Sequence, residues 1–255
     1  MQTNLKVRVI PVIQYFNWQI VKSREFKDYR TVGNLDMTVD VYNKRLVDEL
    51  VIIDIGSSKQ DCTVNKFVLE TLSRYCLMPV TFGGGITNLK DIETCLMHGC
   101  DKVIINTEII LNHKFAREAV ERFGSQCIVI SVDYLCDDQG NYLVFSHCEK
   151  DTTDLDFFDY LKMINDSEVG ELLLTNVKKE GWMSGMDLEI IPKIQDFIGI
   201  PILLNGGVYN PQHIYEGFQS GASAVCASSI FSFTQYGYRD IKIFLQETEI
   251  PVRNN

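Results

Sequence analysis

A glycine run at Gly83–Ile86 has the composition of an anion-binding turn, because it stands between an apolar run and a helical pattern. Glycine lets the backbone approach an anion closely, and the N–H groups at a helix start have no partners within the helix. A second segment, Asn205–Gly207, repeats this arrangement, and small polar residues end two further apolar runs. We therefore predict two phosphate sites. The residues expected to contact phosphate are Gly84, Gly85, Asn106, Thr107, Gly206, Gly207, Ser228 and Ser229.

Eight short apolar runs, each followed by a turn, are expected to position these residues. Continuous apolar runs are typical of strands that are buried on both faces, as in parallel sheets. The expected strands are Val7–Ile13, Glu49–Ile55, Pro79–Phe82, Lys102–Asn106, Cys127–Val132, Glu171–Asn176, Pro201–Asn205 and Ala224–Ala227. Helical patterns between them include Val64–Tyr75, Asn88–His98, Asn112–Phe123, Leu155–Ser167, Leu188–Ile198 and Pro211–Ser220. This alternation favours an α/β fold, a closed (β/α)8 or TIM barrel, over an open doubly wound sheet.

An internal repeat indicates that the barrel is built from two repeated half-barrels. The segment VDELVIID at 47–54 aligns with VGELLLTN at 169–176, and GGITNLKDI at 84–92 aligns with GGVYNPQHI at 206–214. Both pairs have the same offset of 122 residues, which is the signature of fused repeats. We expect a single barrel domain over residues 1–255. Its expected parts are half-barrels at about 5–125 and 126–240 and a C-terminal tail at 241–255.

Charge and cysteine content limit the functions open to the chain. Its 24 Lys and Arg residues against 34 Asp and Glu give a formal net charge of −10, which argues against broad contact with nucleic acid. The eight cysteines form no CxxC pair, which favours free thiols in a reducing cytoplasm. The N-terminal sequence lacks a signal-peptide pattern, and no apolar run reaches 18 residues. We therefore expect a cytoplasmic protein without a membrane segment, metal or cofactor.

Several motifs carry a resemblance to a known family. The segments are Arg8–Pro11, Val21–Lys22, Asp48–Asp54, Gly83–Ile86, Asp101–Thr107, Arg122–Gln126 and Ser131–Asp133. In order and spacing they resemble HisF, the cyclase subunit of imidazole glycerol phosphate synthase, over roughly residues 5–235. In that family, ammonia from a glutaminase partner enters the bottom of the barrel. At the top it cleaves a bisphosphorylated aminoimidazole precursor and closes the imidazole ring. The resemblance implies a phosphorylated small-molecule ligand and a HisH-like glutaminase subunit at the N-terminal face.

The resemblance also implies an acid–base pair, of which one member is missing. Asp133 matches the family's aspartate at the end of strand five, but Gln14 stands where the family has an aspartate at the end of strand one. A glutamine amide does not exchange protons near neutral pH, so it can orient a substrate but cannot serve as general acid or base. The resemblance further assigns Lys22 and Glu180 to the catalytic site and Gly181 to phosphate binding.

Four charged residues match the ring that closes the bottom of the HisF barrel and gates ammonia entry. They are Arg8, Glu49, Lys102 and Glu171, and each begins or nearly begins an expected strand. Side chains at such positions can point inward at the N-terminal mouth. Two cations and two anions make a neutral ring, which limits the cost of burying charge. The alternative is that these residues only cap the barrel end.

The stretch from Lys22 to Asn34 is unlike the usual HisF loop. It resembles HisF-like proteins that are encoded with surface-glycan genes and described as glycosyl amidation-associated. That resemblance implies a further partner, an ATP-dependent sugar amidotransferase. Together with Gln14, it favours a subunit that channels ammonia for amidation of a surface-glycan sugar. The alternatives are a cyclase (lyase) subunit for histidine biosynthesis that tolerates Gln14, and a non-catalytic, phosphate-binding activator of a glutaminase.

Overall fold

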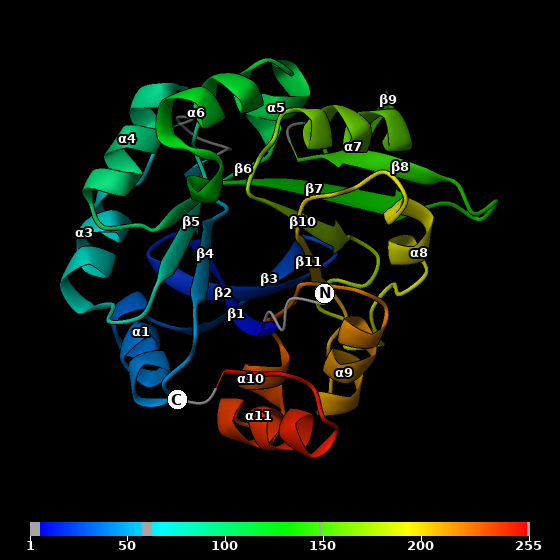
Figure 1. Cartoon of the computed structure of the whole chain (residues 1–255). Helices are drawn as coiled ribbons and strands as arrows, with labels where there is room; N and C mark the ends of the chain where they lie inside the picture. Colours follow the sequence, from blue (N-terminus) through cyan, green and yellow to red (C-terminus); the bar gives the residue numbers. More distant parts are fainter. Residues whose placement is uncertain (1–5, 58–62, 148, 254–255) are drawn as a thin grey trace.

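In the computed structural model, which describes residues 6–57, 63–147 and 149–253, eight parallel strands close into a barrel inside a ring of helices (Figure 1). The barrel strands are β1 (Arg8–Phe16), β4 (Leu50–Asp54), β5 (Val80–Gly83), β6 (Lys102–Ile105), β7 (Ile128–Cys136), β10 (Glu171–Asn176), β11 (Ile202–Asn205) and β12 (Ala224–Ala227). Each pairs in parallel with the next, β12 pairs with β1, and β10 pairs with β7. These pairings confirm the predicted (β/α)8 fold.

The helices follow the barrel strands along the chain. Those described are α1 (Leu35–Lys44), α3 (Lys66–Tyr75), α4 (Leu89–Met97), α5 (Thr107–Leu111), α6 (Phe115–Phe123), α7 (Phe157–Asp166), α8 (Ile190–Ile194), α9 (Pro211–Gln219), α10 (Ile230–Phe233) and α11 (Tyr238–Glu247), with a 3-10 turn at Ser125–Cys127. Asparagine side chains cap the N-termini of several of these helices. Asn88 accepts hydrogen bonds from two N–H groups at the start of α4, and Asn210 does so once for α9, which satisfies donors that a helix start leaves free.

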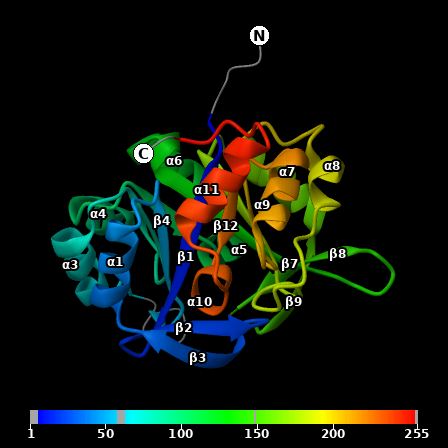
Figure 2. The ribbon, with the colours of Figure 1, turned by 90° about the horizontal axis from the view of Figure 1, so that it is seen from below.

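Two hairpins that the sequence patterns did not predict extend the barrel. They are β2 (Gln19–Arg24) with β3 (Lys27–Gly33), and β8 (Tyr142–Ser146) with β9 (Asp151–Asp156). As a result, β1 and β7 run three and four residues beyond their predicted ends and pair in antiparallel fashion with β2 and β8. Figure 2 shows β2 and β3 lying across the end of the barrel opposite the start of β1. The predicted helix at Leu155–Ser167 begins only at Phe157, because the preceding residues belong to β9.

Apolar side chains form two layers, as expected for strands buried on both faces. The larger layer lies between the barrel strands and the helices. The smaller layer fills the inside of the barrel and consists of Ile10, Val12, Val51, Ile104, Val129, Leu173, Leu203, Ala224 and Cys226. Side chains alternate between the layers along a strand; in β1, for example, Val9 and Ile13 face outward while Ile10 and Val12 face inward. The barrel interior is therefore packed and apolar below its C-terminal mouth.

The C-terminal residues complete the end of the barrel where the strands begin. The expected tail from 241 lies in helix α11 as far as Glu247. The buried Tyr238 hydroxyl donates to the carbonyl of Val9 and accepts from the N–H of Asp48. Val252 then forms a parallel bridge with Val7. The two ends of the described chain therefore meet beside the first residues of β1.

Cysteines and helices give two further results. The described cysteines, Cys76, Cys95, Cys100, Cys127, Cys136 and Cys226, have free thiols. Cys62 and Cys148 lie outside the described residues. Within the described ranges, no helix has the length and apolar character that crossing a lipid bilayer requires.

Candidate functional site

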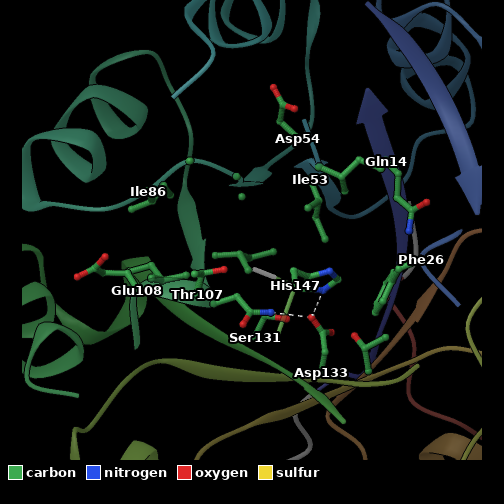
Figure 3. Close-up of a pocket in the computed structure, with 18 of the residues that line it drawn as sticks. Gln14, Phe26, Ile53, Asp54, Ile86, Thr107, Glu108, Ser131, Asp133 and His147 are labelled. Carbon is green, nitrogen blue, oxygen red and sulfur yellow. Dashed lines mark hydrogen bonds and ion pairs between the residues drawn. The ribbon is translucent and has the colours of Figure 1, made fainter. Parts of the chain in front are cut away.

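A pocket of about 280 Å³ opens at the C-terminal ends of the barrel strands. Its polar and aromatic lining includes Gln14, Phe26, Asp54, Asn106, Thr107, Glu108, Asp133 and His147 (Figure 3). Its apolar lining includes Val12, Ile53 and Ile104, which belong to or pack against the inner barrel layer. The pocket therefore stands directly on the apolar interior of the barrel.

The first predicted phosphate set lines one wall of this pocket. Gly84 and Gly85 both contribute to the lining, as do Asn106 and Thr107. The two glycines have φ of +119° and +70°, backbone conformations that residues with a Cβ rarely adopt. A Cβ on Gly84 would also lie 2.3 Å from the carbonyl oxygen of Asp54. Glycine is therefore required here by conformation and by space, and it leaves backbone facing the pocket.

The second predicted phosphate set does not line the pocket. Ser228 and Ser229 are buried, and a Cβ on Gly207 would lie 2.1 Å from the carbonyl oxygen of Gly185, so the 183–186 segment packs directly on this turn. Lys22 donates a hydrogen bond to the Ser228 hydroxyl, which in turn donates to the carbonyl of Val12. The structure therefore brings the first set together at the cavity, whereas the second set is covered by the chain itself.

The loop after β10 also covers Gly206, the remaining residue of the second phosphate set. Gly206 lies beside the loop after β10, where a Cβ would be 3.1 Å from the carbonyl oxygen of Asn176. In the same loop, a Cβ on Gly181 would lie 1.9 Å from the carbonyl oxygen of Ser23, in strand β2. The backbone N–H of Glu25 donates to the carbonyl of Glu180. The β2–β3 hairpin and the β10 loop are thus tied together over this half of the mouth.

Asp133 forms the centre of a hydrogen-bonded group beside this first set, because β7, which carries it, is the neighbour of β6. Its Oδ2 accepts a hydrogen bond from Asn106 Nδ2 at 2.6 Å and lies 2.7 Å from Nε2 of His147; Figure 3 shows both interactions as dashed lines. Asp133 comes from β7, whereas His147 directly follows β8. The Phe26 ring stands 4.5 Å from the imidazole, centroid to centroid. A carboxylate and an imidazole are therefore paired at the surface of the cavity.

The four charged residues predicted to close the barrel bottom do form a continuous ring. Arg8 reaches both carboxylates, at 2.7 Å to Glu49 and 2.6 Å to Glu171. Lys102 reaches the same two carboxylates, at 3.2 Å and 2.9 Å. Burial opposes charge on Glu49, but Lys102 and Arg8 outweigh it and lower the pKa of this carboxyl. Glu49 is therefore ionised at neutral pH, in a ring that stands below the apolar interior.

Comparison with known proteins places this geometry in a family. Residues 8–236 match the model of the family described as histidine biosynthesis protein. A Campylobacter jejuni protein described as putative imidazole glycerol phosphate synthase subunit hisF2 is 41% identical, over 98% of this chain and 99% of its own. The imidazole glycerol phosphate synthase subunit HisF of Chloroherpeton thalassium is 36% identical, again over 98% and 99%. The chain belongs to the HisF family.

Membership of the HisF family changes the balance between the hypotheses. Both relatives carry the name of a synthase subunit, and neither name mentions a glycan. The comparisons therefore support the cyclase alternative better than sugar amidation, the hypothesis that the Lys22–Asn34 stretch and Gln14 favour at the level of sequence.

In this HisF family member, Gln14 belongs to a buried polar cluster. Its Nε2 donates to Oε1 of Glu180 at 3.3 Å, and its Oε1 accepts from the Ser23 hydroxyl at 3.0 Å. Gln14 lines the pocket, but Glu180 and Lys22 lie behind it and do not. Burial raises the pKa of Glu180 to about 7, against the opposing charge of Lys22. Burial lowers the pKa of Lys22 to about 8, against the opposing charge of Glu180.

Replacing Glu180 by glutamine tests this cluster through the pH dependence of stability. A carboxyl whose pKa rises on folding from 4.5 to about 7 stabilises the protein below pH 4.5 and loses that contribution as the pH rises through 7. The Glu180→Gln variant should therefore gain in melting temperature relative to wild type between about pH 5 and pH 8. Melting curves at the two pH values measure this difference. A difference in melting temperature that stays constant, or that shrinks with rising pH, would contradict a raised pKa of the buried Glu180 carboxyl.

Four residues of the polar and aromatic lining are not found by the sequence patterns, namely Phe26, Asp54, Glu108 and His147. His147 lacks metal-ligand spacing, which predicts a surface or capping residue. It reaches Asp133 because the β7–β8 hairpin folds the chain back, with Tyr134 opposite Val144. Phe26 lies in the β2–β3 turn at φ +58°, and Asp54 ends β4. The short apolar run Tyr142–Phe145, directly after the turn-forming residues at 137–141, was the available signal for that hairpin.

Proposed function

We propose that the chain is the ammonia-using subunit of an imidazole glycerol phosphate synthase-type enzyme, a lyase that works with a glutaminase. The observation that carries this proposal is that the charged ring, the apolar interior and the pocket follow one another along the axis of one barrel. Each part suits one step: docking and entry of ammonia, passage, and reaction with a phosphorylated ligand. Full-length similarity to two proteins named as synthase subunits supports the same function.

The path for ammonia follows from the solvation of its two forms. NH3 is small and neutral, whereas NH4+ loses a large solvation energy in an apolar medium. The inner layer of the barrel would therefore pass NH3 and exclude its protonated form and water-borne ions. The ring of Arg8, Glu49, Lys102 and Glu171 stands at the entrance and must open for passage, because its ion pairs close the ring on all four sides. Its N-terminal position fits a glutaminase docked at that end.

The ligand would bind by phosphate at the first glycine set. Gly84 and Gly85 leave room for an anion at the wall of the cavity, with Asn106 and Thr107 beside them. This places the phosphate at the ends of β5 and β6, in the same pocket as Gln14. The body of the ligand would then lie over the inner layer, where NH3 arrives.

A second candidate is delivery of ammonia to a different acceptor, such as a surface-glycan sugar held by a third subunit. Two observations favour it: Gln14 cannot transfer protons, and the second phosphate set is covered by Lys22 and the β10 loop. In this case the barrel would serve as a conduit from the glutaminase.

The experiment that separates the candidates supplies ammonium chloride and the bisphosphorylated aminoimidazole precursor to the purified protein. Formation of the imidazole product at rates typical of enzymes, roughly 1 per second or faster, would support the first. Absence of product, combined with stimulation of the glutaminase by the chain, would support the second. Product formation can be followed chromatographically and glutaminase activity by glutamate release.

Restoring the missing carboxylate is the matched test for Gln14. In the first candidate, the Gln14→Asp variant should turn over the precursor faster than wild type, by on the order of 10²-fold, because an aspartate can exchange protons and an amide cannot. Gln14→Glu, one methylene longer, is the control for position. A variant no faster than wild type would mean that position 14 does not limit proton transfer.

A further inference from the structure

We propose that His147 is the proton-transfer residue of the pocket and that Asp133 is the carboxylate that positions it. This inference rests on the proposed function, because it concerns the addition of ammonia at the same site. Its first support is a contrast between two positions. Gln14 offers the pocket no titratable group, whereas His147 lines the pocket with an imidazole, a side chain that can both accept and donate a proton.

The pairing fixes which ring nitrogen is available. A carboxylate oxygen only accepts hydrogen bonds, so the Nε2 of His147 that faces Asp133 at 2.7 Å carries its proton. In the neutral imidazole, Nδ1 then has the free lone pair. Asp133 is held in place because the same Oδ2 also accepts from Asn106. This is the arrangement in which an acid orients a histidine base and stabilises its protonated form.

Exposure distinguishes the two members of the pair. The Asp133 side chain is 6% exposed, whereas that of His147 is 27% exposed. The carboxylate is therefore suited to holding the imidazole, and the imidazole to meeting a ligand. Phe26, at 4.5 Å, and Phe145, edge-on at 5.4 Å, confine the ring from two sides. Phe26 belongs to the β2–β3 turn, so the hairpin over the mouth also fixes the imidazole.

The other titratable groups of the pocket are less suited to this role. Asp54 is committed to structure: its carboxylate accepts from the N–H groups of Gly56 and Ser57 and from Asn65. Glu108 lies in the first turn of the short helix α5 on the glycine wall, and burial raises its pKa. Glu180 faces Gln14 from behind and does not line the cavity.

The proposed step moves one proton through His147. The lone pair of NH3 forms a bond to an unsaturated, electrophilic carbon of the ligand, and the π electron pair of that carbon moves to the adjacent heteroatom, which leaves the added nitrogen cationic. Nδ1 of neutral His147 takes one proton from that nitrogen and becomes an imidazolium paired with the Asp133 carboxylate. The displaced pair then re-forms the π bond as the leaving heteroatom departs with its bonding electron pair and takes the same proton from the imidazolium. His147 returns to its neutral form, and no other acid or base is consumed.

The test replaces His147 by asparagine and measures ammonium-dependent turnover against pH, expressed per concentration of free NH3. Wild type should lose rate as falling pH protonates the imidazole. His147→Asn should be slower by on the order of 10²–10⁴-fold and should lack this limb of the profile. His98→Asn is the matched control, because His98 contacts the carbonyl of Thr94 in α4 and does not line the pocket. It should retain wild-type rate and profile.

Two further outcomes separate this inference from the proposed function. An active wild type with a His147→Asn variant of equal rate, or with an unchanged pH profile, would overturn the role of His147 and leave the function standing. A wild type that is inactive with the precursor would overturn the function. In that case, ¹⁵N NMR of histidine-labelled protein still tests the pair: we expect an Nε2–H tautomer for His147 at about pH 8, where a neutral imidazole is ordinarily the main form, and an Nδ1–H tautomer would overturn it.

Discussion

Arg8→Met should cost about 3–5 kcal/mol of folding free energy, because it leaves two buried carboxylates with only one cation. Arg8 makes the two shortest contacts of the ring, and the two carboxylates that it contacts, Glu49 and Glu171, are buried at the barrel end. Burial disfavours charge on Arg8 itself, but the carboxylates of Glu171 and Glu49 outweigh it and raise its pKa. Urea unfolding at neutral pH measures the loss.

The chain offers a matched control and a rescue for this variant. Lys44→Met removes a cation from an ion pair with Asp40 whose side chains are 74% and 57% exposed; exposed pairs of this kind contribute about 0.3–0.5 kcal/mol. Adding Glu171→Gln to Arg8→Met restores charge balance and should recover part of the stability. If Arg8→Met and Lys44→Met lose equal amounts of folding free energy, the ring does not behave as a buried network of ion pairs.

Gly84→Ala should destabilise the fold and abolish phosphate binding at the pocket. A Cβ there meets the carbonyl oxygen of Asp54 at 2.3 Å, and the backbone φ of +119° is strained for alanine. Backbone strain and overpacking together cost roughly 2–6 kcal/mol. The neighbouring backbone must shift to relieve this contact, which displaces the wall that we propose holds the anion. Isothermal titration calorimetry with inorganic phosphate measures the loss of binding.

Gly99→Ala separates conformational strain from crowding. Gly99 also has a positive φ, +89°, but no atom lies within 4 Å of the position that a Cβ would take there. The Gly99→Ala variant should lose only roughly 1–2 kcal/mol of folding free energy, which is the cost of the left-handed conformation, and it should keep its phosphate affinity. Phosphate binding by Gly84→Ala at wild-type affinity would contradict an anion site at the glycine run.

The barrel was accessible to sequence reasoning because its strands repeat regularly, whereas the four residues of the ring were identified through the resemblance to HisF. Parallel strands buried on both faces appear as continuous apolar runs, and the register of neighbouring strands places residues such as Arg8 and Glu171 at one end. Strands β10 and β12 have the predicted bounds, Glu171–Asn176 and Ala224–Ala227. Such features depend on spacing along the chain and on little else.

The positions of the site residues that the sequence did not predict depend instead on how irregular segments fold back onto the barrel. His147 comes to Asp133 only through the turn and the register of β7 with β8, and nothing in its own neighbours fixes that register. The position of Lys22, which the resemblance assigns to the catalytic site, also depends on an irregular segment. Its ammonium group is directed to Ser228 and the carbonyl of Val12 because the β2–β3 hairpin lies down on the mouth.

The bridge between Val7 and Val252 has a practical consequence for anyone who attaches this protein to a support. An affinity tag or fluorescent fusion at either end of the described chain would project beside Arg8, at the face where we propose that a glutaminase docks. The turn at 137–141 projects from the side of the barrel (Figure 2), and Gly140 there has open space around it. A label inserted in that turn would leave both openings of the barrel accessible.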